Sequence, residues 1–102
     1  MSFTKIENRI LEKIITSNLT KRQLKVLLFI IRFSFGLNKK YAVFDKKDFF
    51  YAGISPYHVE GESKKLIVRG VIKWNPEKRM FWINRNLKEW VDKKHRVDFF
   101  RG

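Results

Sequence analysis

The stretch GISPYHVEGESKKLIVRGVIKW, residues 53–74, combines the signals of a helix with those of a strand directly after it. Ser55 followed by Pro56 predicts a helix start, because serine caps a first turn and proline suits the first helical position. Gly70, after a basic last turn, predicts the helix end. The β-branched and aromatic residues 71–74 then indicate a strand.

The flanking segments predict short helices and strands joined by short turns. Helices are expected over residues 4–17, 21–34, 46–52, 55–68 and 86–97, and strands over residues 41–44, 71–74 and 79–84. Three helix starts have the spacing of a capping box, in Thr4 with Glu7, Thr20 with Gln23, and Asn86 with Glu89. Asn75-Pro76-Glu77-Lys78 forms the turn of a hairpin. The order is therefore α-α-β-α-α-β-β-α.

The helix after Thr20 is apolar on nearly every side. Leu24, Leu27, Leu28 and Ile31 share one face, and Val26, Phe29, Ile30 and Phe33 cover much of the rest. Such a helix lies at the centre of a core or in a subunit interface. A homodimer is therefore among the expectations.

Composition and charge narrow the class of protein. The chain has 102 residues, of which 44% are hydrophobic, enough for one folded domain. It carries a net charge of +13, which favours a polyanionic partner. We expect nucleic acid rather than an anionic membrane or a basic surface that serves solubility alone. No apolar run is long enough to span a bilayer, no secretion signal is evident, and there is no cysteine. We expect a cytoplasmic protein.

Two short helices separated by a tight turn and followed by a hairpin indicate an α+β fold, a small winged helix-turn-helix domain. We expect residues 1–102 to form one domain, with its core in residues 3–85 and a C-terminal helix over about 86–97.

Several segments resemble the N-terminal domain of the phage replication protein O family. They are Phe3-Thr4-Lys5-Ile6-Glu7-Asn8, the run from Leu19 to Leu27, Phe35-Gly36 and Asn38-Lys39-Lys40. The resemblance covers most of residues 3–85 and implies a winged helix that binds a phage replication origin. It also implies a separate C-terminal region that engages helicase-loading proteins. With 102 residues, the sequence is either a domain excised from such an initiator or a small protein that acts alone.

The helix over residues 55–68 departs from the family pattern on its outer face. Helical spacing places Val59, Ser63 and Leu66 toward the core. Tyr57, Gly61 and Lys64 then face outward, with His58 near the edge and Glu60 and Glu62 close by. Arginine, asparagine and glutamine are the usual readers of base edges, and this face has none. We expect the two glutamates to pair with Lys64 and Lys65.

Charge is richer elsewhere. Residues 55–72 carry a net +1, residues 73–85 a net +3, and residues 20–34 a net +4 from Lys21, Arg22, Lys25 and Arg32. Phosphate contacts position a protein on DNA without specifying sequence. The predicted DNA-binding residues are Lys21, Arg22, Lys39, Lys40, Lys46, Lys47, Tyr57, His58, Lys64, Lys73, Lys78 and Arg79.

Aromatic residues and histidines complete the candidate list. Phe49, Phe50, Tyr51, Trp74, Phe81 and Trp82 could stack on unpaired bases, but core packing is the expectation for most of them. Because neighbours on a strand face opposite sides, one of Phe81 and Trp82 should be the more exposed. His58 and His95 are the only histidines, and no glycine-rich phosphate loop is present, so we expect no enzyme, no metal and no cofactor.

The leading hypothesis is a phage-type replication initiator domain that binds double-stranded DNA mainly through phosphate contacts. A small winged-helix transcription regulator would use the same scaffold. The altered helix face also leaves open a protein-interaction module that binds a replication or host protein. Preference for single-stranded DNA is a further alternative.

Overall fold

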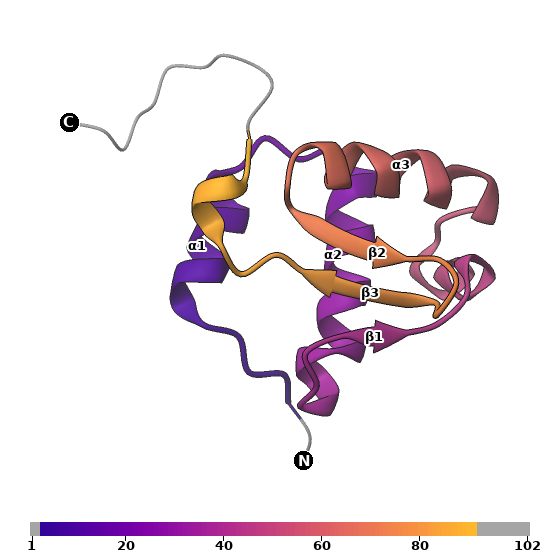
Figure 1. Ribbon diagram of the computed structural model, residues 1–102, viewed down its shortest axis with the longest axis horizontal. Helices are drawn as coiled ribbons and strands as arrows, with labels where there is room; N and C mark the ends of the chain where they lie inside the picture. The colour runs from indigo at the N-terminus through magenta and orange to yellow at the C-terminus, as the bar shows by residue number, and fades with distance from the viewer. Residues whose placement is uncertain (1–2, 92–102) are drawn as a thin grey trace.

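The computed structural model describes residues 3–91, which fold into helices packed on a small antiparallel sheet (Figure 1). The α-helices are α1 (Asn8–Thr16), α2 (Lys21–Phe33) and α3 (Pro56–Val68). Short 3-10 helices are η1 (Phe35–Leu37), η2 (Lys46–Ala52) and η3 (Leu87–Glu89). The strands are β1 (Ala42–Val43), β2 (Ile72–Asn75) and β3 (Met80–Ile83), with β3 between the other two. The α+β fold is confirmed.

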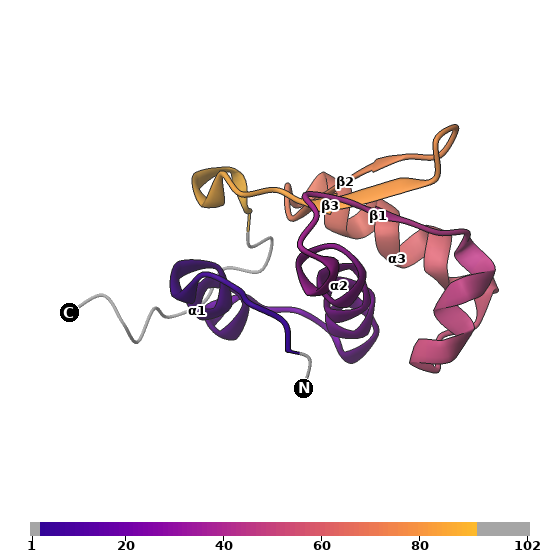
Figure 2. The ribbon, with the colours of Figure 1, turned by 90° about the horizontal axis from the view of Figure 1, so that it is seen from below.

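Helix α2 is the centre of this arrangement. Figure 2 shows it beneath the sheet, with α1 on one side and η2 on the other. The predicted capping box forms, because Gln23 N–H donates to Thr20 Oγ1 at 3.2 Å and Thr20 N–H donates to Gln23 Oε1 at 3.1 Å. The buried face is Val26, Leu27, Ile30 and Ile31, while Leu24 and Leu28 are exposed. Both apolar sets contribute to this buried face, Leu27 and Ile31 from one and Val26 and Ile30 from the other, and α2 lies at the centre of the core.

The sheet presents one apolar face to the helices. Register pairs Ile72 with Ile83 and Trp74 with Phe81, so these side chains share the inner face, and Lys73 and Trp82 share the outer one. Phe81 is 1% exposed and Trp82 is only half-buried, which confirms the expected alternation.

Two aromatic residues of η2 are exceptions to the core packing expected for most of the six aromatic candidates. Phe49 is buried, but Phe50 is 70% and Tyr51 is 85% exposed. A 3-10 helix turns once in about three residues, so only one of three consecutive side chains can face the core.

Both ends of the fold differ from expectation. Helix α1 begins at Asn8, and the Thr4–Glu7 capping box is absent, since Glu7 makes no side-chain cap and instead pairs with Arg9 at 3.0 Å. At the other end, η3 is a single 3-10 turn and Trp90 is extended, so residues 86–91 do not form the expected α-helix.

The extended end is held by non-local bonds. Trp90 Nε1–H donates to Asn84 O at 2.8 Å, and Val91 N–H donates to Arg69 O at 2.7 Å. The backbone N–H of Val91, which a helix would pair within the segment, is thus bonded to a distant residue. The rest of the predicted helix, with Val97 and His95, lies outside the described residues.

Candidate nucleic-acid interface

Helix α3 is built as its sequence predicts. Ser55 Oγ accepts from Tyr57 N–H at 3.2 Å, Pro56 occupies the first turn, and Val59, Ser63 and Leu66 are buried. Tyr57 is consequently 86% exposed, and its ring contacts half-buried His58 edge-on at 5.3 Å.

Gly61 lies one helical turn beyond Tyr57 on the same outward side. The helix runs through it without interruption, and a Cβ placed on it would meet no atom within 4 Å. Packing within the described residues therefore does not require glycine here. The bare backbone leaves room for a close approach by a ligand.

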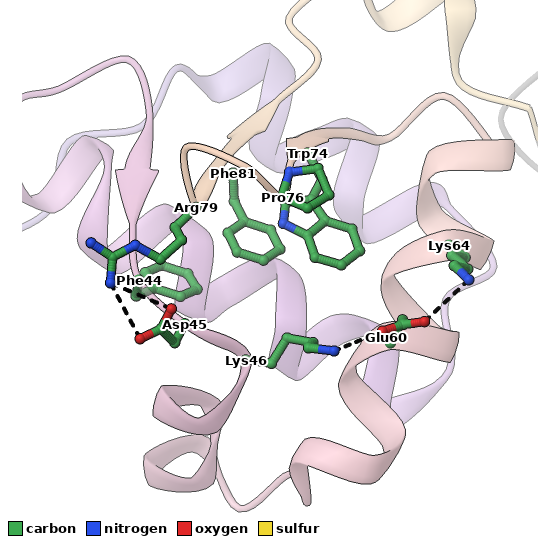
Figure 3. Close-up of a pocket in the computed structure, with 9 residues that line it drawn as sticks. All are labelled: Phe44, Asp45, Lys46, Glu60, Lys64, Trp74, Pro76, Arg79 and Phe81. Carbon is green, nitrogen blue, oxygen red and sulfur yellow. Dashed lines mark hydrogen bonds and ion pairs between the residues drawn. The ribbon is translucent and has the colours of Figure 1, made fainter.

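The glutamates of α3 are engaged by lysines. Glu60 lies 3.2 Å from Lys64 Nζ and 2.7 Å from Lys46 Nζ (Figure 3). Glu62 lies 4.0 Å from Lys65 Nζ. The predicted helical pairs are confirmed, while the pair with Lys46 crosses from α3 to η2. Hydrogen bonds from Lys46 and then Lys64 lower the pKa of the Glu60 carboxyl. At neutral pH the ionised Glu60 carboxylate therefore forms ion pairs with the ammonium groups of both Lys46 and Lys64.

The β2–β3 hairpin ends in a tip held against the β1–η2 junction. Arg79 has a left-handed φ of 55°, and its guanidinium lies 3.3 Å from Asp45 Oδ2. Lys78 projects from the exposed tip, whereas Lys73 lies beside Trp82 on the outer face of the sheet.

A hollow of about 300 Å³ separates α3 from this hairpin (Figure 3). Its lining is formed by Phe44, Asp45, Lys46, Glu60, Lys64, Trp74, Pro76, Arg79 and Phe81. Three predicted DNA-binding residues, Lys46, Lys64 and Arg79, therefore meet around one opening, and each already contacts a carboxylate.

The other predicted cations contact no carboxylate within residues 3–91. They are Lys21, Arg22, Lys39, Lys40, Lys47, Lys73 and Lys78. Lys39 and Lys40 stand before β1, at the end of the sheet away from the hairpin tip, because Val43 pairs with Met80. Lys39 lines a second hollow, about 320 Å³ and largely apolar. The structure thus does not bring this pair to the hairpin tip.

Lys25 is absent from the predicted set but belongs with these cations. Its Nζ would lie 3.3 Å from a Cβ on Gly53, the left-handed residue between η2 and α3. Lys21 and Lys25 are one helical turn apart, so their spacing could have identified the pair. The ammonium group of Lys25 on α2 therefore lies beside the turn before α3.

Two features are absent from the described part of the chain. Residues 3–91 contain no group of three or more histidine and acidic residues arranged to hold a metal ion. None of their helices has the length and apolar character needed to cross a membrane.

Comparisons with known proteins agree with the resemblance seen in the sequence. The chain is 29% identical over 92 residues to DNA replication protein gp18 of Salmonella phage P22. The match covers 89% of this chain and 33% of that protein, so the chain spans about a third of its relative's length. No solved structure matches. The model of the bacteriophage replication protein O family matches residues 2–90, and the chain belongs to that family.

Proposed function

We propose that this chain is the duplex-DNA-binding domain of a phage replication initiator, with η2, α3 and the β2–β3 hairpin acting as a winged helix-turn-helix. Family membership and the DNA replication protein of phage P22 support a role in replication. The order β1, η2, α3, β2, β3 and the sheet order β1-β3-β2 support the winged-helix interpretation. The protein would act in the cytoplasm of the host cell, without catalysis or a cofactor.

The observation that carries the proposal is the set of cations that contact no carboxylate among residues 3–91. Lys21, Arg22 and Lys25 lie on α2, Lys47 lies on η2, and Lys78 lies at the hairpin tip. Together with the net charge of +13, they give the chain several sites for phosphate. Tyr57 and Gly61 would approach or border the major groove, while Lys64 remains engaged by Glu60. Phosphate contacts would therefore dominate the affinity.

A protein-interaction role is the second candidate, because apolar side chains remain exposed on α1 and α2. Ile15 is 69% and Leu28 is 48% exposed. A homodimer or a replication or host protein could cover them. Stoichiometric complex formation with weak, non-saturating DNA binding would favour this candidate.

Fluorescence anisotropy with a labelled random duplex across a salt series tests the proposal. About five phosphate contacts predict a log–log slope of about −4 to −5. An unlabelled single strand that carries abasic sites serves as the competitor. The proposal requires the protein to bind the duplex more tightly than this strand. Weak binding that does not respond to salt would contradict it and favour the protein-interaction role.

A further inference from the structure

The hollow between α3 and the hairpin has an aromatic wall. The rings of Phe44 and Phe81 lie 4.9 Å apart with an angle of 11° between their planes. Those of Phe81 and Trp74 lie 5.2 Å apart at 10°. Three rings are therefore nearly parallel in one row, and all three line the opening (Figure 3).

Core packing explains part of this row but not all of it. Phe81 is buried and contacts Phe49 edge-on at 5.5 Å, as a core residue does. Phe44 is half-buried and also contacts Phe29 at 5.1 Å and Phe49 at 4.8 Å. Trp74 is half-buried as well, and the space in front of it stays open. An open site walled by parallel rings suits a flat ligand, because aromatic faces prefer offset stacking.

The charged rim narrows the class of that ligand. Lys46, Lys64 and Arg79 outnumber the two carboxylates, Asp45 and Glu60, so the lining carries a net +1 within a chain of net +13. The aromatic wall and the positive rim together suit a ligand that is an anionic chain carrying flat rings. Single-stranded nucleic acid is such a ligand. The volume of about 300 Å³ lies at the lower end of the range of about 300–1,000 Å³ for small-ligand sites, which suits one ring system.

We propose that this hollow binds one unpaired base of single-stranded DNA, which stacks on Trp74. The net positive charge of the lining attracts the anionic strand, while Lys46, Lys64 and Arg79 keep their carboxylate partners. A base inside a duplex cannot reach such a wall, because it is already stacked between its neighbours. The two carboxylates offer acceptors to amino groups on the base edge. The site is independent of the duplex contacts proposed above, which rest on cations outside the hollow.

Two single strands of equal charge provide the test, one intact and one abasic, each of about eight nucleotides, within the span of one small single-strand site. Anisotropy should show the intact strand bound at least about tenfold more tightly, which equals about 1.4 kcal/mol. The Trp74→Leu variant should lose this preference. Trp82→Leu, on the outer face of the same hairpin, should keep it, and duplex affinity measured in parallel should be unaffected in both.

Equal affinity of the wild-type protein for the intact and the abasic strand would overturn the proposal. The hollow would then be better suited to bind a side chain of a protein partner. A preference that survives in Trp74→Leu would also overturn it. If circular dichroism shows that Trp74→Leu does not fold, photocross-linking of the wild-type protein to a 5-iodouracil strand decides. Adducts at Trp74 or Phe44 support the site, while adducts only at exposed Phe50, Tyr51 or Tyr57, or none, contradict it.

Discussion

Helices α2 and α3 pack against each other, but their lysines differ in whether they are paired with a carboxylate. Both begin at a hydroxyl cap, Thr20 or Ser55. Residues 20–34 contain no acidic residue, and Lys21 and Lys25 meet no carboxylate within the described chain. In α3, Lys64 and Lys65 each face a glutamate of their own helix.

If α3 is the DNA-binding element that we propose, its shape suits that role better than its charge does. In the proposed winged helix, α3 would be the recognition helix, but Glu60 pairs with Lys46 and Lys64, whose ammonium groups would otherwise meet phosphate. The same carboxylate ties α3 to η2 through Lys46, so it also supports the angle between these two elements. Under the proposed function, phosphate contacts would therefore fall to cations outside α3.

Charge reversal on α2 should have the largest effect. Lys21→Glu/Lys25→Glu removes two phosphate contacts and adds repulsion, so we expect affinity for duplex DNA to fall about a hundredfold or more near 0.15 M salt. Anisotropy measures the change. The control Lys5→Glu/Lys88→Glu alters net charge equally at exposed positions on other segments. A similar loss in the control would show that only the total charge matters.

Freeing the lysines around α3 should act in the opposite direction. Glu60→Gln releases Lys46 and Lys64, so affinity should rise and the salt slope should steepen by about 1 to 2. Glu77→Gln removes the same charge from the hairpin tip, where Glu77 contacts no cation within residues 3–91. If both variants gain equally, the ion pairs of Glu60 do not restrain these lysines.

Gly61→Ala separates stability from binding. Alanine finds open space and improves helix propensity, so the free energy of unfolding should rise by about 1 kcal/mol. If the α3 backbone approaches DNA at this point, the added methyl group should weaken binding severalfold. Thermal melting and anisotropy on one preparation give both values. Unchanged affinity would show that α3 stays clear of the groove at Gly61.

The smallest effect concerns the buried side of α3. Ser63 is fully buried, and its Oγ has no hydrogen-bond partner within the described residues. Ser63→Ala should therefore leave the free energy of unfolding unchanged or raise it by up to about 1 kcal/mol in urea denaturation. Ser34→Ala is the matched control, because it deletes the bond from Ser34 Oγ to Ile30 O at 2.6 Å and should lose about 1 kcal/mol.

Features that depend on near neighbours could be predicted from the sequence. The Thr20–Gln23 box, the buried side of α3 and the alternation of Phe81 and Trp82 each follow from one helical or strand period. The ion pairs Lys46–Glu60 and Arg79–Asp45 could not, since they join residues 14 and 34 positions apart. These ion pairs determine which lysine and arginine side chains already have a carboxylate partner.

The C-terminal segment shows the same limit. Asn86 and Glu89 have capping-box spacing, but Asn84 Nδ2–H donates to Glu89 Oε1 at 2.8 Å, and Trp90 is buried. Burial of a large aromatic residue and bonds to distant backbone outweigh a local preference of this kind. Local spacing therefore predicted a longer helix, of which residues 86–91 form only the single 3-10 turn η3.

The most direct test compares the two helices with variants that lose the same charge. Salt series with duplex DNA should be recorded for Lys21→Ala/Lys25→Ala and for Lys64→Ala/Lys65→Ala. We predict that the first flattens the log–log slope by about 2, because both cations contact phosphate, and that the second changes it by less than about 0.5. A larger change in the α3 variant would contradict the account, because α3 would then hold the phosphate backbone despite its glutamates.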